Sequence, residues 1–220
     1  MEIFQLLKDS LPSLLSGLSV TIELAVISLI LAVILGIILG IFSISTSRIL
    51  KSIATAYIYI IRGTPLMIQA LFLYFGVGQA LNIQFDPVVA GIITLTANAS
   101  AYMAEIFRGG IQAIDVGQME AARSLGLSYS KAMRKVILPQ AVKIMIPSIL
   151  NQFIVTLKDT SILTVISVRE LTESGKIIIA RNYKALPMYA IVACMYFIII
   201  TALSLLLSYL ERRSSYGNKR

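Results

Sequence analysis

The sequence predicts an all-α, polytopic membrane protein built as a bundle of about five transmembrane helices. Two observations predict this class. First, 57% of the 220 residues are hydrophobic, only 14% are charged, and the mean hydropathy is +0.85, whereas soluble domains are about 45–50% apolar and about 25% charged. Second, five apolar segments are close to or above the roughly 20 residues that a helix needs to cross a bilayer. A soluble globular enzyme and a disordered chain are therefore excluded.

The expected spans belong to one transmembrane domain, 1–220, and lie at residues 20–44, 53–81, 88–107, 144–166 and 187–210. Ser19 and Thr21 mark the expected start of the first span. Gly36 and Gly40 form a GxxxG pattern in it, which either admits a closely packed second helix or simply occurs in an apolar helix.

The second span is interrupted at Arg62-Gly63-Thr64-Pro65. Glycine loosens a helix and proline removes a backbone donor, so we expect either a kink at this point or a first part of the span that lies at the membrane interface. Residues 108–143 and 169–184 are too polar to span, and we expect both stretches to lie outside the membrane.

The distribution of Lys and Arg predicts which side of the membrane each loop faces, because cytoplasmic loops are enriched in these residues. With the N-terminus outside and the C-terminus inside, twelve face the cytoplasm and five face outward. The twelve are Arg48, Lys51, Arg108, Arg123, Lys131, Arg134, Lys135, Lys143, Arg212, Arg213, Lys219 and Arg220; the five are Lys8, Arg169, Lys176, Arg181 and Lys184. The net charge of +8 thus reflects a lipid bilayer rather than nucleic acid as partner.

A helix–glycine–helix elbow is predicted in the cytoplasmic stretch. Residues 116–125 form an amphipathic helix, Gly126 ends it as a C-cap, and Ser128 or Ser130 begins a second helix. Pro139 and Pro147 then redirect the chain into the membrane. Such an elbow is either a docking site for another protein or an ordinary solvated loop.

The same stretch resembles the EAA motif of the permeases of importer-type ABC transporters. That motif reads EAA, three residues, Gly, nine residues, Ile, one residue and Leu-Pro. The matching residues are Glu120, Ala121, Ala122, Gly126, Leu138 and Pro139, and Val136 stands where the family usually has Ile. Two further segments, Arg62-Gly63-Thr64-Pro65-Leu66 with Gln69 and Lys158-Asp159-Thr160-Ser161, resemble the polar amino-acid branch of this family. With the five-span layout, the resemblance covers nearly the whole chain.

The resemblance implies a permease subunit of an ATP-driven importer for polar amino acids, with basic ones among the candidates, in the bacterial inner membrane. It implies no catalytic residue and three partners: an ATP-binding cassette subunit that the six motif residues couple to, an extracytoplasmic amino-acid-binding protein, and a second permease copy. For this copy a homodimer is favoured and a heterodimer is left open. The chain has no GxxxxGK[ST] motif, so we expect ATP and Mg on the partner. Without His and with one Cys, it has no ligands for a Cys/His zinc site.

Polar side chains in the third and fourth spans are candidates for a substrate path or pocket, because polar groups in hydrocarbon are costly. Their spacing of three and four residues places them on one face of each helix. They are Thr94, Asn98, Tyr102 and Glu105 in the third span and Gln152, Thr156 and Asp159 in the fourth, with Lys158 as a candidate counter-ion. Asn98 suits the head of a zwitterion, and Asp159 or Glu105 a positive group. The alternative role is interhelical hydrogen bonding that holds the bundle together.

A different function class, a secondary amino-acid transporter working on an ion gradient, is the main alternative. Such proteins commonly show inverted repeats, and no repeat is visible here. An intramembrane enzyme would need a nucleophile–base pair, which a chain without His and with Cys194 in an apolar run does not offer.

Overall fold

The computed structural model describes residues 2–215, and side chains for residues 4–209. Within this range the chain forms helices and no strand. Four helices are long and apolar enough to cross a membrane: Phe4–Ser43, Pro87–Gln112, Tyr129–Ile166 and Ala185–Tyr209. A bent pair, Arg48–Arg62 with Leu66–Leu81, makes a fifth span if it is taken as one. The all-α, polytopic class is confirmed.

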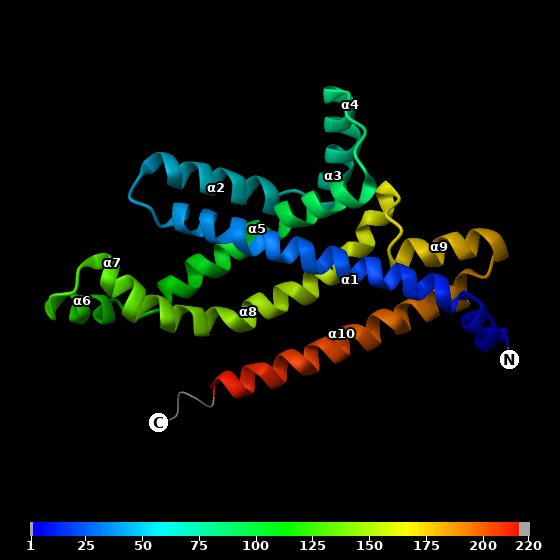
Figure 1. Ribbon diagram of the computed structural model, residues 1–220. Coiled ribbons are helices and arrows are strands. Elements are labelled where there is room, and N and C mark those ends of the chain that lie inside the picture. Colours follow the sequence, from blue (N-terminus) through cyan, green and yellow to red (C-terminus); the bar gives the residue numbers. More distant parts are fainter. Residues whose placement is uncertain (1, 216–220) are drawn as a thin grey trace.

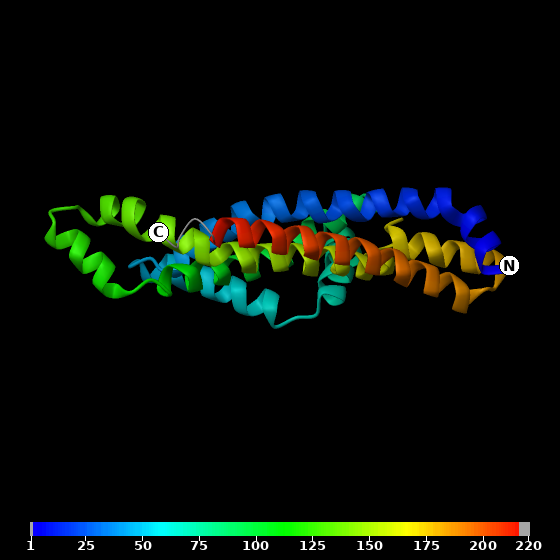
Figure 2. The ribbon, with the colours of Figure 1, turned by 90° about the horizontal axis from the view of Figure 1, so that it is seen from below.

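The helices run in one elongated bundle with the elbow at one end and the N-terminus at the other (Figures 1 and 2). Their bounds are α1 Glu2–Ser43, α2 Arg48–Arg62, α3 Leu66–Leu71, α4 Gly78–Leu81, α5 Pro87–Gln112, α6 Val116–Ser124, α7 Tyr129–Ala132, α8 Leu138–Asp159, α9 Leu171–Asn182 and α10 Ala185–Ser215. Phe72–Val77 and Met133–Ile137 are π-helical turns, and Thr160–Ile166 is a 3₁₀ turn. Of the basic tail, Lys219 and Arg220 lie outside the described residues, as do the side chains of Arg212 and Arg213.

The first helix begins much earlier than predicted, at Glu2. Ser19 and Thr21 do not mark its start, because their hydroxyls donate to backbone carbonyls inside the helix, at Ser16 (2.7 Å) and Gly17 (3.2 Å). The added turns are held by apolar contacts, since Leu14 is fully buried in a core cluster that includes Met188 of α10. Polar residues that pair locally do not end a helix.

The GxxxG pattern lies where α1 packs along α5. A Cβ atom built on Gly36 would lie 2.4 Å from Cβ of Met103, and one built on Gly40 would lie 3.0 Å from Cβ of Phe107. Real Cβ atoms essentially never approach as closely as the first distance, and the second is tighter than nine in ten real contacts. The two glycines therefore admit α5, which confirms the first of the two interpretations of this pattern.

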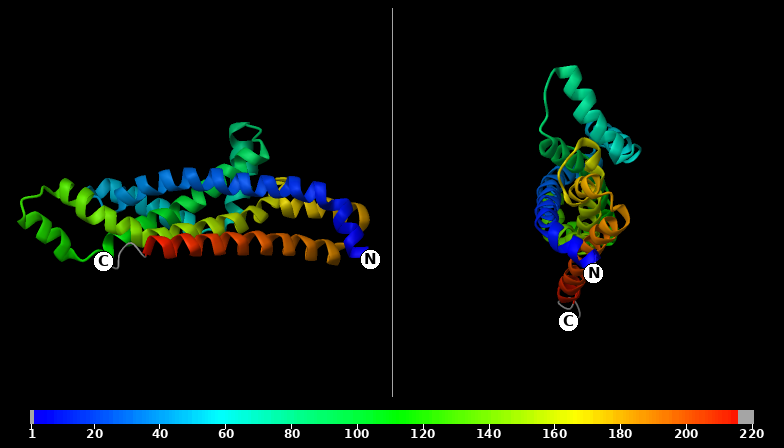
Figure 3. Two further views of the ribbon diagram at one scale, coloured as in Figure 1. Left: turned by 60° about the horizontal axis from the view of Figure 1, so that its bottom comes forward. Right: turned by 90° about the vertical axis from the view of Figure 1, so that its right-hand side faces the viewer.

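The second span is broken where the sequence predicts a kink. The axes of α2 and of the segment Leu66–Leu81 differ by 104°, and this segment, which we call the arm, stands away from the bundle (Figure 3). The base of the arm is anchored, because Leu66 and Ala70 are buried in a core cluster with Leu95 and Leu163.

The helix that follows the elbow is continuous, and here the prediction was wrong. Pro139 and Pro147 do not redirect the chain, because one helical segment runs from Tyr129 to Ile166 and contains both. The π-helical turn just before the proline, in which the N–H of Leu138 donates to the carbonyl of Met133, widens the helix where the ring would otherwise clash with the preceding turn. The long helices on either side of the elbow thus extend into the predicted coupling stretch 108–143: α5 ends at Gln112, and the next long helix begins at Tyr129.

Candidate functional site

The elbow consists of α6 and α7 with the turn between them. Gly126 has φ +82°, and around it the N–H of Leu127 donates to the carbonyl of Ala122 (3.2 Å) and the N–H of Gly126 to that of Arg123 (3.0 Å). This pair of bonds is a Schellman motif, so the predicted C-cap is confirmed. Asp115, which sequence reasoning missed, caps the other end of α6 by accepting from the N–H of Gly117 (2.7 Å).

The EAA motif residues divide between the interior and the surface of the elbow. Ala122 is 4% exposed, and Ala132 of α7 is fully buried, so small side chains let the two short helices pack. Glu120, Ala121 and Pro139 are exposed, and Leu138 is half-buried. The motif therefore both shapes the elbow and provides its outer face.

Large apolar side chains also lie on the outside of the elbow. Val116 is 71% exposed, Leu125 is 84% exposed and Tyr129 is 55% exposed. The elbow stands at the end of the bundle (Figures 1 and 2), where apolar exposure of this kind favours contact with another protein.

The polar residues of α5 have different environments. Thr94 is 3% exposed and donates to the carbonyl of Ala90 in its own helix (2.8 Å). Asn98 is 8% exposed, and its Nδ2 donates to Oε1 of Gln69 in α3 (3.1 Å). Tyr102 is exposed at the surface of the helix. The predicted face exists, and its middle contacts the base of the arm.

Glu105 is paired with two arginines. Arg108 donates to both of its carboxylate oxygens (3.0 and 2.8 Å), and Nη1 of Arg62 lies 3.5 Å from Oε2. The Arg62 guanidinium also lies 5.3 Å from the centre of the Tyr102 ring, within cation–π range. Because two guanidinium groups flank one carboxylate, Glu105 is already neutralised, which leaves Asp159 as the candidate for a positive substrate group.

The polar residues of α8 are less uniform than their spacing predicts. Gln152 and Thr156 are buried, and the hydroxyl of Thr156 donates to the carbonyl of Gln152 (2.9 Å). Lys158 is exposed and Asp159 is half-buried. Among the ion pairs of the described residues, none within 4.0 Å joins Lys158 to Asp159.

A groove of about 640 Å³ brings the two helices together. Its lining includes Tyr102 and Glu105 from α5 and Ser148, Asn151 and Gln152 from α8. Five of the predicted path residues are not in this lining: Thr94, Asn98, Thr156, Lys158 and Asp159. A second groove of about 630 Å³ lies on the other side of Tyr102 and Glu105 and includes Arg62 and Arg108.

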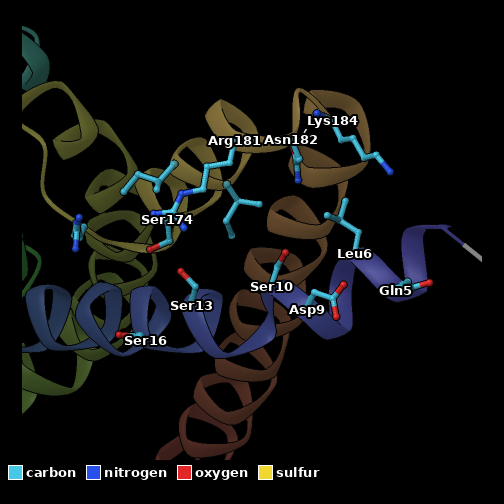
Figure 4. Close-up of a pocket in the computed structure, with 13 residues that line it drawn as sticks. Gln5, Leu6, Asp9, Ser10, Ser13, Ser16, Ser174, Arg181, Asn182 and Lys184 are labelled. Atoms are coloured by element: carbon cyan, nitrogen blue, oxygen red, sulfur yellow. Dashed lines mark hydrogen bonds between the residues drawn. The ribbon is translucent and has the colours of Figure 1, made fainter.

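A third groove, of about 740 Å³, opens at the end of the bundle opposite the elbow. Polar side chains of α1 and α9 line it, among them Asp9, Ser13, Ser174 and Arg181 (Figure 4). Sequence reasoning did not find this groove, because it forms between two helices that are distant in the sequence.

Glu170 is the other residue that sequence reasoning missed. It is fully buried, accepts from the N–H of Glu173 (2.8 Å) as the N-cap of α9, and accepts from the hydroxyl of Tyr196 (2.7 Å). Its Oε2 also lies 3.5 Å from Oγ1 of Thr21 in α1. Burial is the main influence on this carboxyl and raises its pKa, while these hydrogen bonds oppose the shift. Glu170 thus joins α1, α9 and α10. The available signal was Glu173, which follows Glu170 by three residues, the spacing of a capping box at the start of a helix.

Comparison with known proteins identifies the family of this chain. Residues 32–216 match the family described as binding-protein-dependent transport system inner membrane component. The chain belongs to this family.

Relatives of the permease have amino-acid transport in their names. This chain is 40% identical over 205 residues to the glutamine transport system permease protein GlnP of Escherichia coli (strain K12), and the match covers 93% of this chain and 94% of the relative. It is 38% identical over 203 residues to the arginine transport system permease protein ArtQ of Bacillus subtilis (strain 168), covering 92% and 93%. A crystal structure of an amino acid ABC transporter with histidines superimposes with a TM-score of 0.92 at 40% identity, covering 97% of this chain and 99% of that one. The permease is thus a transport component and a multi-pass membrane protein, not a catalytic subunit.

Proposed function

We propose that this permease forms the translocation path of an ATP-driven importer for polar amino acids in the bacterial inner membrane. The names of its relatives support amino acids as cargo. The observation that carries the mechanism is the elbow, whose Leu125 is 84% exposed at one end of the bundle. No observation favours a secondary transporter.

The elbow docks into an ATP-binding cassette subunit. Its outer face combines Glu120 with the apolar side chains of Val116 and Leu125, which lose contact with water on docking. ATP and Mg bind to that partner, and Glu120, Ala121, Ala122, Gly126, Leu138 and Pro139 transmit its movement to α8.

The opposite end of the bundle faces outward and receives the amino-acid-binding protein. Its groove of about 740 Å³ between α1 and α9 offers the polar contacts that transient interfaces use. A second copy of the permease completes the transporter, with a homodimer favoured over a heterodimer.

The substrate passes along the polar faces of α5 and α8. The groove with Tyr102, Glu105 and Gln152 is the inner part of this path. Thr94, Asn98, Thr156, Lys158 and Asp159 belong to the part further from the elbow, and Asp159 meets a positive group of the substrate.

Reconstitution tests this function. The permease, its ATP-binding subunit and its binding protein, placed together in proteoliposomes, are expected to take up a radiolabelled L-amino acid only when ATP is enclosed. Leu125→Ser is expected to weaken binding of the ATP-binding subunit at least tenfold, because it removes a central apolar contact of about 2 kcal/mol.

Leu186→Ser is the matched control. Leu186 is 85% exposed at the start of α10, at the end of the bundle opposite the elbow, so this variant is expected to keep the wild-type affinity for the ATP-binding subunit. Equal affinities of the two variants would show that the elbow is not the docking site.

A further inference from the structure

The break between α2 and α3 is held by one amide side chain. The last carbonyls of a helix have no partners within the helix, and here Nε2 of Gln69 donates to the carbonyls of Ile61 (2.7 Å) and Thr64 (3.1 Å). It also contacts Oγ1 of Thr64 (2.9 Å), whose own proton goes to the carbonyl of Ile60 (2.9 Å). Gln69 thus closes the end of α2.

These partners fix the orientation of the Gln69 amide. Backbone carbonyls only accept hydrogen bonds, so the amide atom that faces Ile61 and Thr64 is the nitrogen. The oxygen, Oε1, must then point the other way, toward α5. There it accepts from Nδ2 of Asn98 (3.1 Å).

The orientation of Gln69 in turn fixes that of Asn98. Because Oε1 of Gln69 requires a donor, Asn98 presents its nitrogen to the arm and its oxygen, Oδ1, away from it. Oδ1 has no hydrogen-bond partner among the described residues, although Asn98 is only 8% exposed. Every fully buried side-chain oxygen in the described part of the chain has a partner, so Oδ1 is not fully covered by the residues of this chain.

We propose that Gln69 is a positioning residue that fixes the amide of Asn98 so that its Oδ1 points away from the arm and accepts a hydrogen bond from an N–H group of the substrate. This inference rests on the proposed function and sharpens it. The donor is either the α-ammonium group, which all amino acids carry, or a terminal N–H of the side chain.

Ligand analogues distinguish the two donors. Equilibrium binding is measured on the complete permease–ATP-binding-subunit complex in nanodiscs, without the binding protein, using radiolabelled L-glutamine and L-arginine. Competing ligands are glutaramic acid and 5-guanidinopentanoic acid, which lack the α-amino group, and the γ-methyl ester of L-glutamate, which lacks the side-chain N–H. One of these analogues lacks the N–H group that donates a hydrogen bond to Oδ1 of Asn98. In the wild type, that analogue is expected to bind at least tenfold more weakly than the amino acid from which it derives.

Alanine substitutions at Gln69 and Asn98 are expected to remove this discrimination. In Asn98→Ala and Gln69→Ala the ratio between parent and analogue falls below threefold. Gln69→Glu is the second variant in case Gln69→Ala fails to fold: a carboxyl oxygen at this position still accepts from Nδ2 of Asn98 in either protonation state, so this variant is expected to keep the discrimination. Gln79→Ala, on the exposed surface of α4, keeps the wild-type ratio as the matched control.

The outcomes separate the inference from the proposed function. Equal loss of affinity for parent ligands and analogues in the Gln69 variants means that Gln69 only holds the break, and this overturns the inference. A transporter that imports amino acids but binds none without its binding protein also overturns it and leaves the proposed function intact. A complex that imports no amino acid overturns both.

Discussion

Glu170 shows how a single residue acquires its chemistry from the tertiary structure. Its carboxyl is fully buried between α1, α9 and α10, and burial raises its pKa. In the sequence it is one charge in a mixed-charge stretch, and its partners Thr21 and Tyr196 are distant from it along the chain. Sequence reasoning could place Asn98 and Glu105 on one helix face because three- and four-residue spacing is local. It could not find Arg62 as the second partner of Glu105, or Tyr196 as a partner of Glu170, by the same means, because each comes from another helix.

A pH dependence of stability follows from Glu170. With a raised pKa, the folded state holds the proton at pH values where the unfolded chain has lost it. The stability that this group contributes is complete below the unfolded pKa and is lost as pH rises through the raised pKa of the folded state. We therefore expect the thermal unfolding midpoint of the purified permease complex to fall across this interval.

Two variants test this dependence. Glu170→Gln removes the titrating group, so the fall in the unfolding midpoint with rising pH is expected to become shallower. Tyr196→Phe removes a donor that favours the charged form, so the fall is expected to extend to higher pH. Equal pH profiles in the wild type and in Glu170→Gln would contradict this role.

At the scale of the element, the elbow was the most predictable part of the chain. Its signals are local: a glycine at the end of a short amphipathic helix, followed by serine. The break of the second span was also predictable, because Gly63 and Pro65 act on the backbone directly. The start of α1 and the course of the chain at Pro139 were not, since each depends on a compensating feature, tertiary packing in one case and a π-helical turn in the other.

The glycine of the elbow can be compared with a second glycine that has the same open surroundings. A Cβ atom built on Gly126 or on Gly109 meets nothing within 4 Å, but only Gly126 has a positive φ. Gly126→Ala is expected to destabilise the elbow by about 1–2 kcal/mol, because a left-handed backbone is strained with a side chain.

Gly109→Ala, inside α5, is expected to stabilise the permease by about 0.5–1 kcal/mol, because alanine loses less backbone entropy in a helix. Thermal unfolding midpoints of the two variants should thus move in opposite directions from the wild type. A shift of the same sign in both would show that the turn does not require its left-handed conformation.

At the scale of the whole molecule, the all-α membrane class and the number of spans, four or five with the bent pair, followed from composition and hydropathy, whereas the grooves did not. Each groove is lined by helices that only folding brings together, such as α1 and α9 (Figure 4). The orientation in the membrane remains a prediction from the distribution of Lys and Arg.

Cysteine labelling in intact cells tests this orientation. The native Cys194 is exposed, so it is first replaced by Ser. Lys176→Cys, in α9, is then expected to react with a membrane-impermeant maleimide, and Lys131→Cys, in the elbow, to react only after the cells are permeabilised. Labelling of both cysteines from the same side of the membrane would rule out a five-span topology with the N-terminus outside and the C-terminus inside.

The length of α1 has a mechanical consequence. Leu14 is packed among residues of α9 and α10, and Leu39 among residues of α2 and α5. At a rise of 1.5 Å per residue, the two lie about 38 Å apart on one helix. A rigid rod of that length converts a tilt of about 5° around Leu14 into a displacement of about 3 Å at Leu39. Closure of the groove between α1 and α9 would therefore produce a larger displacement at α2, the helix whose last carbonyls Gln69 binds.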